Sequence, residues 1–288
     1  MIYEYLIQPF TDDSLTRAVI ACLAMSIGSA PLGVFMVLRR MSLAGDTLSH
    51  GIFSGVAIAF VIAGGVSFWP MTIGGILAGF AVTLLNNFVK RNTNLKEDAS
   101  FAGAYMLSLS LGVLIVTTHG GDEELLHLLF GDALNISDQI LHFAASMSVL
   151  SIIGLAIIYR PLIIECVDPI FMRSINGRGA LYHQIFLILV VVNLVASFQA
   201  LGTLMALGLM IFPAISARLW SNNINSTIII SVIIAVISSL AGLLFAYHTK
   251  LPSGPCVVMT GGVIYFLSIF FGKNGILIKF LPHYHLAE

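Results

Sequence analysis

Long intervals without a charged residue constrain this chain most. A transmembrane helix needs about 20 mostly apolar residues, and several intervals that lack Asp, Glu, Lys and Arg are close to that length. Those that fit one span are 18–38, 99–121, 139–159, 219–249 and 251–272. Two longer intervals, 47–89 and 179–217, each have room for two spans. The sequence therefore predicts an all-α polytopic membrane protein with about nine transmembrane helices, within a range of eight to ten.

Turn-forming residues divide the two longer intervals. Gly64, Gly65 and Pro70 predict a turn inside 47–89, and the stretch "QALGT" at 199–203 predicts one inside 179–217, because glycine and proline interrupt helices. Small residues recur at helical spacing in the spans, as in Gly51-x-x-x-Gly55. Such motifs, of which 75–79 is another, let helices approach closely in lipid.

Composition agrees with a membrane protein. The chain is 58% hydrophobic and 9% charged, against roughly 25% charged in soluble domains, and its mean hydropathy is +0.99. No soluble domain is long enough to fold alone, so we expect a single transmembrane domain over 1–288. The net charge of −1 and the absence of a basic run give no indication of a nucleic-acid partner.

Lysine and arginine predict the orientation, since they concentrate in cytoplasmic loops. Only Arg17 and Lys250 fall on the outward side when alternate loops are grouped, which places the N-terminus outside and the C-terminus inside. The inward group is Arg39, Arg40, Lys90, Arg91, Lys96, Arg160, Arg173, Arg178, Arg218, Lys273 and Lys279.

Asp46 and His50 form an isolated polar pair in an apolar span. No other Asp, Glu, Lys or Arg occurs between Met41 and Val89. Residues four apart lie on one helix face, so a carboxylate and an imidazole can reach the same point. An ionised carboxylate is costly in hydrocarbon and usually marks an ion or substrate path, and this pair of ligand types suits Zn(II), Mn(II) or Fe(II).

A structural alternative explains the same pair without a metal. Gly45-Asp46 could form a helix N-cap, with Thr47 and Ser49 as local hydrogen-bond partners and His50 as a packed polar residue. Two ligands do not complete a metal site, so the spacing alone leaves both readings open.

Five blocks along the chain carry recognisable motifs. The blocks are "PLGVFMVLRRMSLAGDTLSHGIFSGVA" (31–57), "LLFGDAL" (128–134), "DPIFMRSING" (168–177), "LGTLMALGLMIFPAISARL" (201–219) and "LPSGPCVVM" (251–259). Together, and in this order, they resemble the membrane permeases of the zinc/manganese/iron ABC importer family. The resemblance is strongest to the zinc-importer permease of Gram-negative bacteria, through the "RRMS..GDTLSH" stretch.

This resemblance implies a fold, partners and roles. It implies a type II ABC importer-like fold and a homodimer in the bacterial inner membrane. Two cytoplasmic ATPase subunits would drive it, and an extracytoplasmic metal-binding protein would deliver the ion, with zinc as the expected cargo and no tightly bound cofactor. Asp46 and His50 match the family's metal positions. The segment 168–177 would be the coupling helix, with Asp168, Phe171, Met172 and Arg173 facing the ATPase; the alternative is an ordinary interfacial helix.

Two other regions carry candidate metal ligands. Many family members have an Asp just before the "PsGP" block, where this chain has Lys250 and a nearby His248. The outward loop 119–138 carries acidic and histidine side chains that could attract cations. Each region also has a structural reading, as a satisfied polar residue and a solvated loop respectively.

Two further function classes remain as alternatives. Asp46 and His50 could couple protons to ion movement in a secondary transporter, or serve a membrane metallohydrolase. The sequence contains neither G-x-x-x-x-G-K-[ST] nor H-E-x-x-H, which are the motifs for ATP phosphates and for a zinc protease. We therefore expect that the chain is not itself an enzyme.

Overall fold

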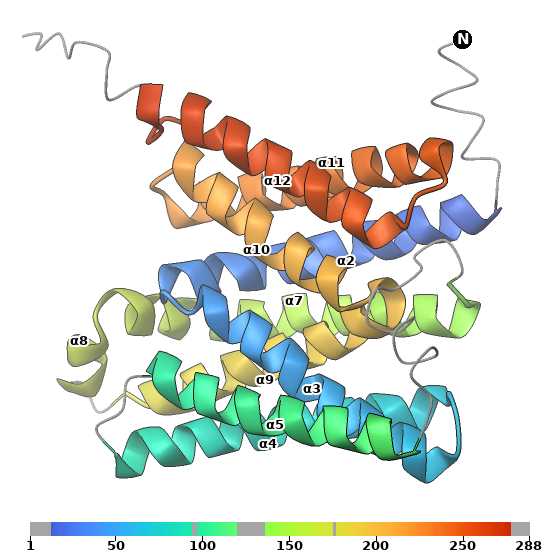
Figure 1. Cartoon of the computed structure of the whole chain (residues 1–288). Coiled ribbons are helices and arrows are strands. Elements are labelled where there is room, and N and C mark those ends of the chain that lie inside the picture. The colour runs from blue at the N-terminus through green and yellow to red at the C-terminus, as the bar shows by residue number, and fades with distance from the viewer. Residues whose placement is uncertain (1–12, 94–96, 120–135, 175–176, 278–288) are drawn as a thin grey trace, which may run out of the picture.

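The computed structural model describes residues 13–93, 97–119, 136–174 and 177–277, and every regular element in these ranges is a helix (Figure 1). The helices are α2 (Asp13–Leu38), α3 (Ser42–Ala63), α4 (Phe68–Asn92), α5 (Glu97–His119), α7 (Asp138–Val167), α8 (Pro169–Ser174), α9 (Gly179–Leu201), α10 (Thr203–Trp220), α11 (Ile224–Thr249) and α12 (Ser253–Phe271).

The spans agree with the charge-free intervals. Within the described ranges, 8 helices are long and apolar enough to cross a membrane, and α5 adds a shorter apolar stretch, Ala99–Ile115. The prediction of about nine spans is thereby confirmed. Both predicted turns are also present: α3 ends before Gly64, which has a φ of 73°, and α9 ends before Gly202, which has a φ of 82°. The chain is a multi-pass membrane protein.

Successive long helices run in opposite directions and so bring alternate connections to the same end of the bundle (Figure 1). The turn 39–41, the segment around α8, and residues 221–223 share one end. The turns 64–67 and 250–252 lie at the other end. This arrangement matches the grouping of basic residues that predicted the orientation, so the end that carries α8 is the one expected to face the cytoplasm.

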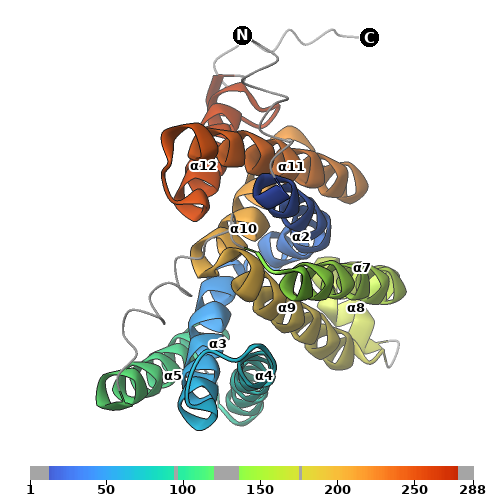
Figure 2. The same cartoon turned by 90° about the vertical axis from the view of Figure 1, so that its right-hand side faces the viewer.

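The helices form two groups that meet along α3, α9 and α10. Figure 2 shows α3, α4 and α5 as one group, apart from α2, α7, α11 and α12. The contacts agree: α3 packs on α4 and α5, and also reaches α9 and α10. One buried apolar cluster joins α3 to α2, α7 and α9, and includes Phe35, Leu48 and Phe186. Helix α3 is thus fixed from several sides.

Close approach of α3 and α4 occurs at glycines. A Cβ on Gly55 would overlap the carbonyl oxygen of Gly74, and one on Gly74 would overlap that of Gly55. One turn earlier, a Cβ on Gly51 would lie 2.9 Å from Val82 Cγ2. These contacts confirm that the small-residue motif containing Gly51 and Gly55 is a packing surface.

Gly55→Ala should destabilise the protein, because the added methyl group meets backbone that cannot move without separating α3 from α4. Overpacking of this kind costs about 1–3 kcal/mol. Gly103→Ala is the matched control, since a Cβ there meets nothing within 4 Å and alanine favours the helix. Thermal unfolding in detergent measures both; an unchanged midpoint for Gly55→Ala would contradict the packing assignment.

Candidate metal site

Helix α3 begins four residues before Asp46. Its N-cap is Met41, with no side-chain cap hydrogen bond, and its first residue is Ser42. Thr47 Oγ1 donates to the Leu43 carbonyl at 3.1 Å, and Ser49 Oγ to that of Gly45 at 3.0 Å. The capping alternative is therefore wrong: Asp46 lies in the second helical turn, and the neighbouring hydroxyl groups serve the helix backbone.

Asp46 and His50 face each other along α3. Asp46 Oδ1 lies 3.5 Å from His50 Nε2, and the two side chains are 57% and 32% exposed, respectively. Both polar ends can therefore be reached from outside this chain. The predicted convergence of a carboxylate and an imidazole on one helix face is present in the structure.

Helix α5 supports His50 from one side. The rings of His50 and Tyr105 have centroids 5.2 Å apart with an interplanar angle of 52°. Next to them, Ser108 Oγ lies 2.6 Å from Ser54 Oγ and donates to the Gly51 carbonyl at 3.1 Å. These contacts fix α5 against α3 directly beside the imidazole. No sequence pattern predicts the role of Tyr105, because its proximity to His50 depends on helix packing.

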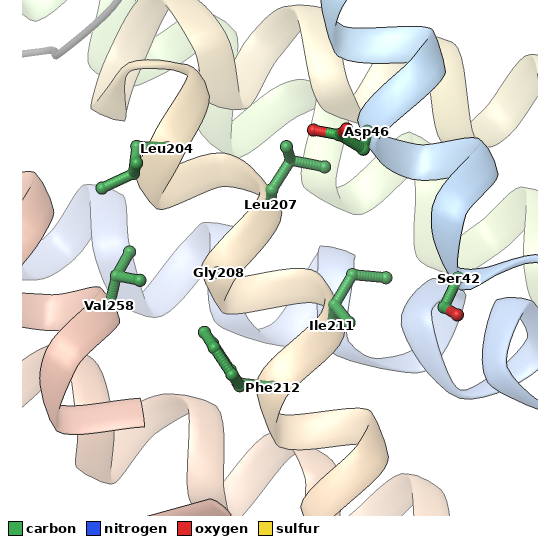
Figure 3. A pocket seen from close by; sticks show the side chains of 8 residues that line it. All are labelled: Ser42, Asp46, Leu204, Leu207, Gly208, Ile211, Phe212 and Val258. Atoms are coloured by element: carbon green, nitrogen blue, oxygen red, sulfur yellow. The ribbon is translucent and has the colours of Figure 1, made fainter. Parts of the chain in front are cut away.

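Asp46 borders a groove between α3, α10 and α12. The groove has a volume of about 280 Å³ and is open on one side. Figure 3 shows the Asp46 carboxylate turned toward the α10 side of the groove, near Leu207. The remaining lining residues are Ser42, Leu204, Gly208, Ile211, Phe212 and Val258. Asp46 is the only ionisable side chain among these lining residues, so it sets the charge of the groove.

In the described part of the chain, Asp46 and His50 have no third potential metal ligand beside them. Among the residues that the structure describes, no group of three or more His, Cys, Asp or Glu side chains is close enough to hold an ion. His248 is not brought to the pair: its Nδ1 contacts the carbonyl of Leu244, one turn earlier on α11, at 2.8 Å. The acidic part of the loop 119–138 lies outside the described residues.

The short helix α8 begins with a well-formed cap. Asp168 Oδ1 accepts hydrogen bonds from the backbone N–H groups of Ile170 at 3.1 Å and Phe171 at 2.8 Å. Ile170 and Phe171 are 77% and 51% exposed, whereas Met172 is 4% exposed. Met172 therefore packs inside its own chain, which corrects the expectation that it faces a partner. The outward apolar groups are Ile170 and Phe171; the side chain of Arg173 lies outside the described set.

The long apolar helices define a polytopic membrane protein, and a carboxylate–imidazole pair is accessible on α3. The chain matches the model of the ABC-3 family, described as the ABC 3 transport family, over residues 11–272, and it belongs to that family. It is a permease of a metal ABC importer, which confirms the family inferred from the five sequence blocks.

Curated relatives agree over almost the whole chain. The manganese import system permease protein ScaB of Streptococcus parasanguinis is 30% identical over 256 residues, covering 89% of this chain and 90% of that protein. A probable iron transport system membrane protein of Haemophilus influenzae is 25% identical and covers 94% of this chain. Among solved structures, PsaBC from Streptococcus pneumoniae in complex with Fab matches with a TM-score of 0.84 and 25% identity, covering 97% of this chain and 99% of that one.

Asp46→Asn and His50→Gln should each abolish metal binding by the purified permease complex. Both substitutions keep the size of the side chain, and each removes or weakens one ligand of the pair. Ser42→Ala is the control, because Ser42 lines the same groove without contributing charge. Isothermal titration with Mn(II) and Zn(II) measures binding. Wild-type affinity in both site variants would show that the pair is not a metal site.

Proposed function

We propose that this chain forms the translocation path of an ATP-driven importer of a divalent transition metal, with Asp46 and His50 as transient ligands of the cargo. The observation that carries the proposal is the accessible pair, 3.5 Å between Asp46 Oδ1 and His50 Nε2, in a chain of the ABC-3 family. An incomplete set of ligands suits transport, because an ion that is held by few groups can also be released.

A second copy of the chain would complete the site. Most soluble oligomers are symmetric, and a two-fold axis presents the same surface from both copies. If that axis passes the open side of the groove, the second Asp46 and His50 give the ion four side-chain ligands. The homodimer is supported by the exposure of the pair and by the open groove beside it.

Manganese is the cargo we propose. The relatives described above are named as manganese or iron transport proteins, whereas the expectation of zinc rests on the resemblance of the "RRMS..GDTLSH" stretch alone. Carboxylate and imidazole ligands bind Mn(II), Fe(II) and Zn(II). Ligand chemistry therefore does not separate the three, and zinc and iron are the competing cargoes.

The proposed transporter also contains cytoplasmic ATPase subunits and an extracytoplasmic metal-binding protein. Asp168 holds the start of α8 through two backbone hydrogen bonds, and Phe171 presents an exposed aromatic ring. Apolar anchors of this kind dominate protein interfaces. We assign docking of the ATPase to the segment 168–177, with Asp168 and Met172 supporting it from within the chain and Phe171 in contact.

Cells that lack their other manganese importers should accumulate radiolabelled manganese when the complete transporter is expressed, and should lose that uptake with Asp46→Asn. Uptake of labelled zinc and iron is measured in parallel at equal concentration. Preferred uptake of zinc would support the cargo expected from the sequence resemblance and refute manganese as the cargo. Transport by this chain alone in liposomes with a proton gradient, without ATPase, would instead establish the secondary-transporter alternative.

Phe171→Asp should detach the ATPase while leaving the permease folded, because the side chain is 51% exposed and a charge there disrupts an apolar anchor. Co-purification of the two proteins measures assembly. Met172→Asp is the contrasting variant, since Met172 is buried and the charge should lower the unfolding temperature instead. Normal assembly and normal metal-coupled ATP turnover in Phe171→Asp would remove α8 from the docking role.

A further inference from the structure

A buried ion pair joins two helices at the end of the bundle that carries α8. Arg39 Nη2 lies 3.6 Å from Glu165 Oε1, and the side chains are only 12% and 14% exposed. Arg39 directly follows α2, and Glu165 lies in the last turn of α7. Removing charges from water is expensive unless they are well paired, so this arrangement needs a reason beyond simple packing.

The Glu165 carboxylate also touches a third helix. It lies against Gly179, the first residue of α9, so closely that a Cβ there would overlap Oε2 and lie 2.7 Å from Cδ. The N-terminus of a helix favours a negative charge. Glu165 therefore meets the end of α2 and the start of α9 at once, and its position depends on both.

The ion pair does not use all the hydrogen-bond donors of the Arg39 guanidinium. A separation of 3.6 Å is longer than a good hydrogen bond. Arg39 Nη1 is buried and has no hydrogen-bond partner within the described part of the chain. The guanidinium thus retains a donor that a small shift between α2 and α7 could engage. A conformational change that engaged this donor would alter the contact between α2 and α7.

On one side, the pair is connected to the metal-site helix by a tight turn. Arg40 has a φ of 59°, a conformation that is unfavourable for a residue with a Cβ. The Met41 N–H donates to the Met36 carbonyl at 2.9 Å, and the Ala44 N–H to the Met41 carbonyl at 2.9 Å. Asp46 follows Ser42 by about 6 Å of helix axis. A displacement of Arg39 is therefore passed to Asp46 over a short, hydrogen-bonded stretch.

On the other side, the pair is connected to α8. Glu165 precedes Asp168 by less than one helical turn, and the Asp168 N–H donates to the Ile164 carbonyl at 2.8 Å. Asp168 then holds the first turn of α8 through its carboxylate. Asp168 thus joins the end of α7 to the start of α8 through backbone and side-chain hydrogen bonds.

We propose that Arg39 and Glu165 are positioning residues that link α8 to the start of α3, so that a nucleotide-driven movement of α8 changes the position of Asp46. This inference rests on the proposed function, in which α8 contacts the ATPase. Neither residue touches the metal; both act through the backbone that they hold together. Physical coupling of this kind requires an element that both ends bias, and the unsaturated ion pair is that element.

The test follows the first turn of α3 in the assembled permease–ATPase complex. Leu43→Cys provides a probe, since Leu43 is 70% exposed, in a Cys166→Ser background; Cys22 and Cys256 are buried. The rate of maleimide labelling is measured with and without ATP plus vanadate. Metal uptake per ATP hydrolysed is measured separately in proteoliposomes.

Glu165→Gln keeps the shape of the side chain and removes its charge. In the native complex we expect nucleotide to change the labelling rate about tenfold, an ordinary size for coupling between sites. In Glu165→Gln this change should fall below about twofold. ATP hydrolysis should continue while uptake per ATP falls. Exchanging the charges, with Arg39→Glu and Glu165→Arg together, should recover part of the effect. Asp138→Asn is the matched control, since it breaks the Arg17–Asp138 ion pair, 3.1 Å, at the other end.

The outcomes separate this inference from the proposed function. An undiminished nucleotide effect in Glu165→Gln overturns the inference, as does the absence of any effect in the otherwise native complex. If the complex with Glu165→Gln fails to assemble, the charge-exchanged variant is tested instead. A charge-exchanged complex that assembles but shows no nucleotide effect on labelling would mean that the ion pair is purely structural, and would overturn the inference. A native complex that moves no metal, but whose Leu43 response depends on Glu165, refutes metal transport as the proposed function; the proposed docking at α8 and the inference that rests on it remain standing.

Discussion

Direct contact between helix backbones is the constraint on which this structure depends. Lipid tails are as apolar as leucine, so the hydrophobic effect does not hold transmembrane helices together, and close packing has to do so. A Cβ on Gly33 of α2 would overlap the carbonyl oxygen of Met210 on α10, as one on Gly55 of α3 would overlap that of Gly74 on α4. These contacts fix how each helix is rotated about its axis, and rotation decides which side chains face a neighbour.

The rotation of α3 produces the site. Helix α4 occupies the side of Gly51 and Gly55, and α5 occupies the side of Ser54 and His50 through Ser108 and Tyr105. The face that carries Asp46 is left beside the groove with α10 and α12. Packing therefore places the single carboxylate of this stretch where an ion can reach it. The same small residues that allow the helices to pack closely also determine which way the Asp46 carboxylate faces.

Charged side chains on different helices have different surroundings. Asp46 and His50 on α3 stay accessible, whereas Arg39 after α2 and Glu165 on α7 are mostly withdrawn from water and paired. Only the turn at Arg40 and the first turn of α3 separate Arg39 from Asp46 along the chain. The proposed transport needs both properties: ligands that exchange readily, and internal contacts that carry motion from the end of the bundle at α8.

Much of this could be predicted from the sequence, because the relevant patterns are local. Charge-free intervals of span length determine the helices, and Gly64 and Gly202 mark the turns that end α3 and α9. The spacing of four between Asp46 and His50 puts both on one face of any helix that contains them. These features depend on residues near one another in the chain, so no knowledge of the packing is needed.

Only the tertiary structure decided the rest. It rejected Asp46 as a helix cap, because α3 starts at Ser42, where no strong sequence signal marks the boundary. In the structure, Met172 is buried and Phe171 is exposed, which sequence periodicity cannot predict for a helix of 6 residues. It also joined Arg39 to Glu165, which are far apart in the sequence. Contacts between distant segments depend on how each helix is rotated about its axis and packed. A helix that is apolar on all sides carries no sequence pattern that specifies this rotation.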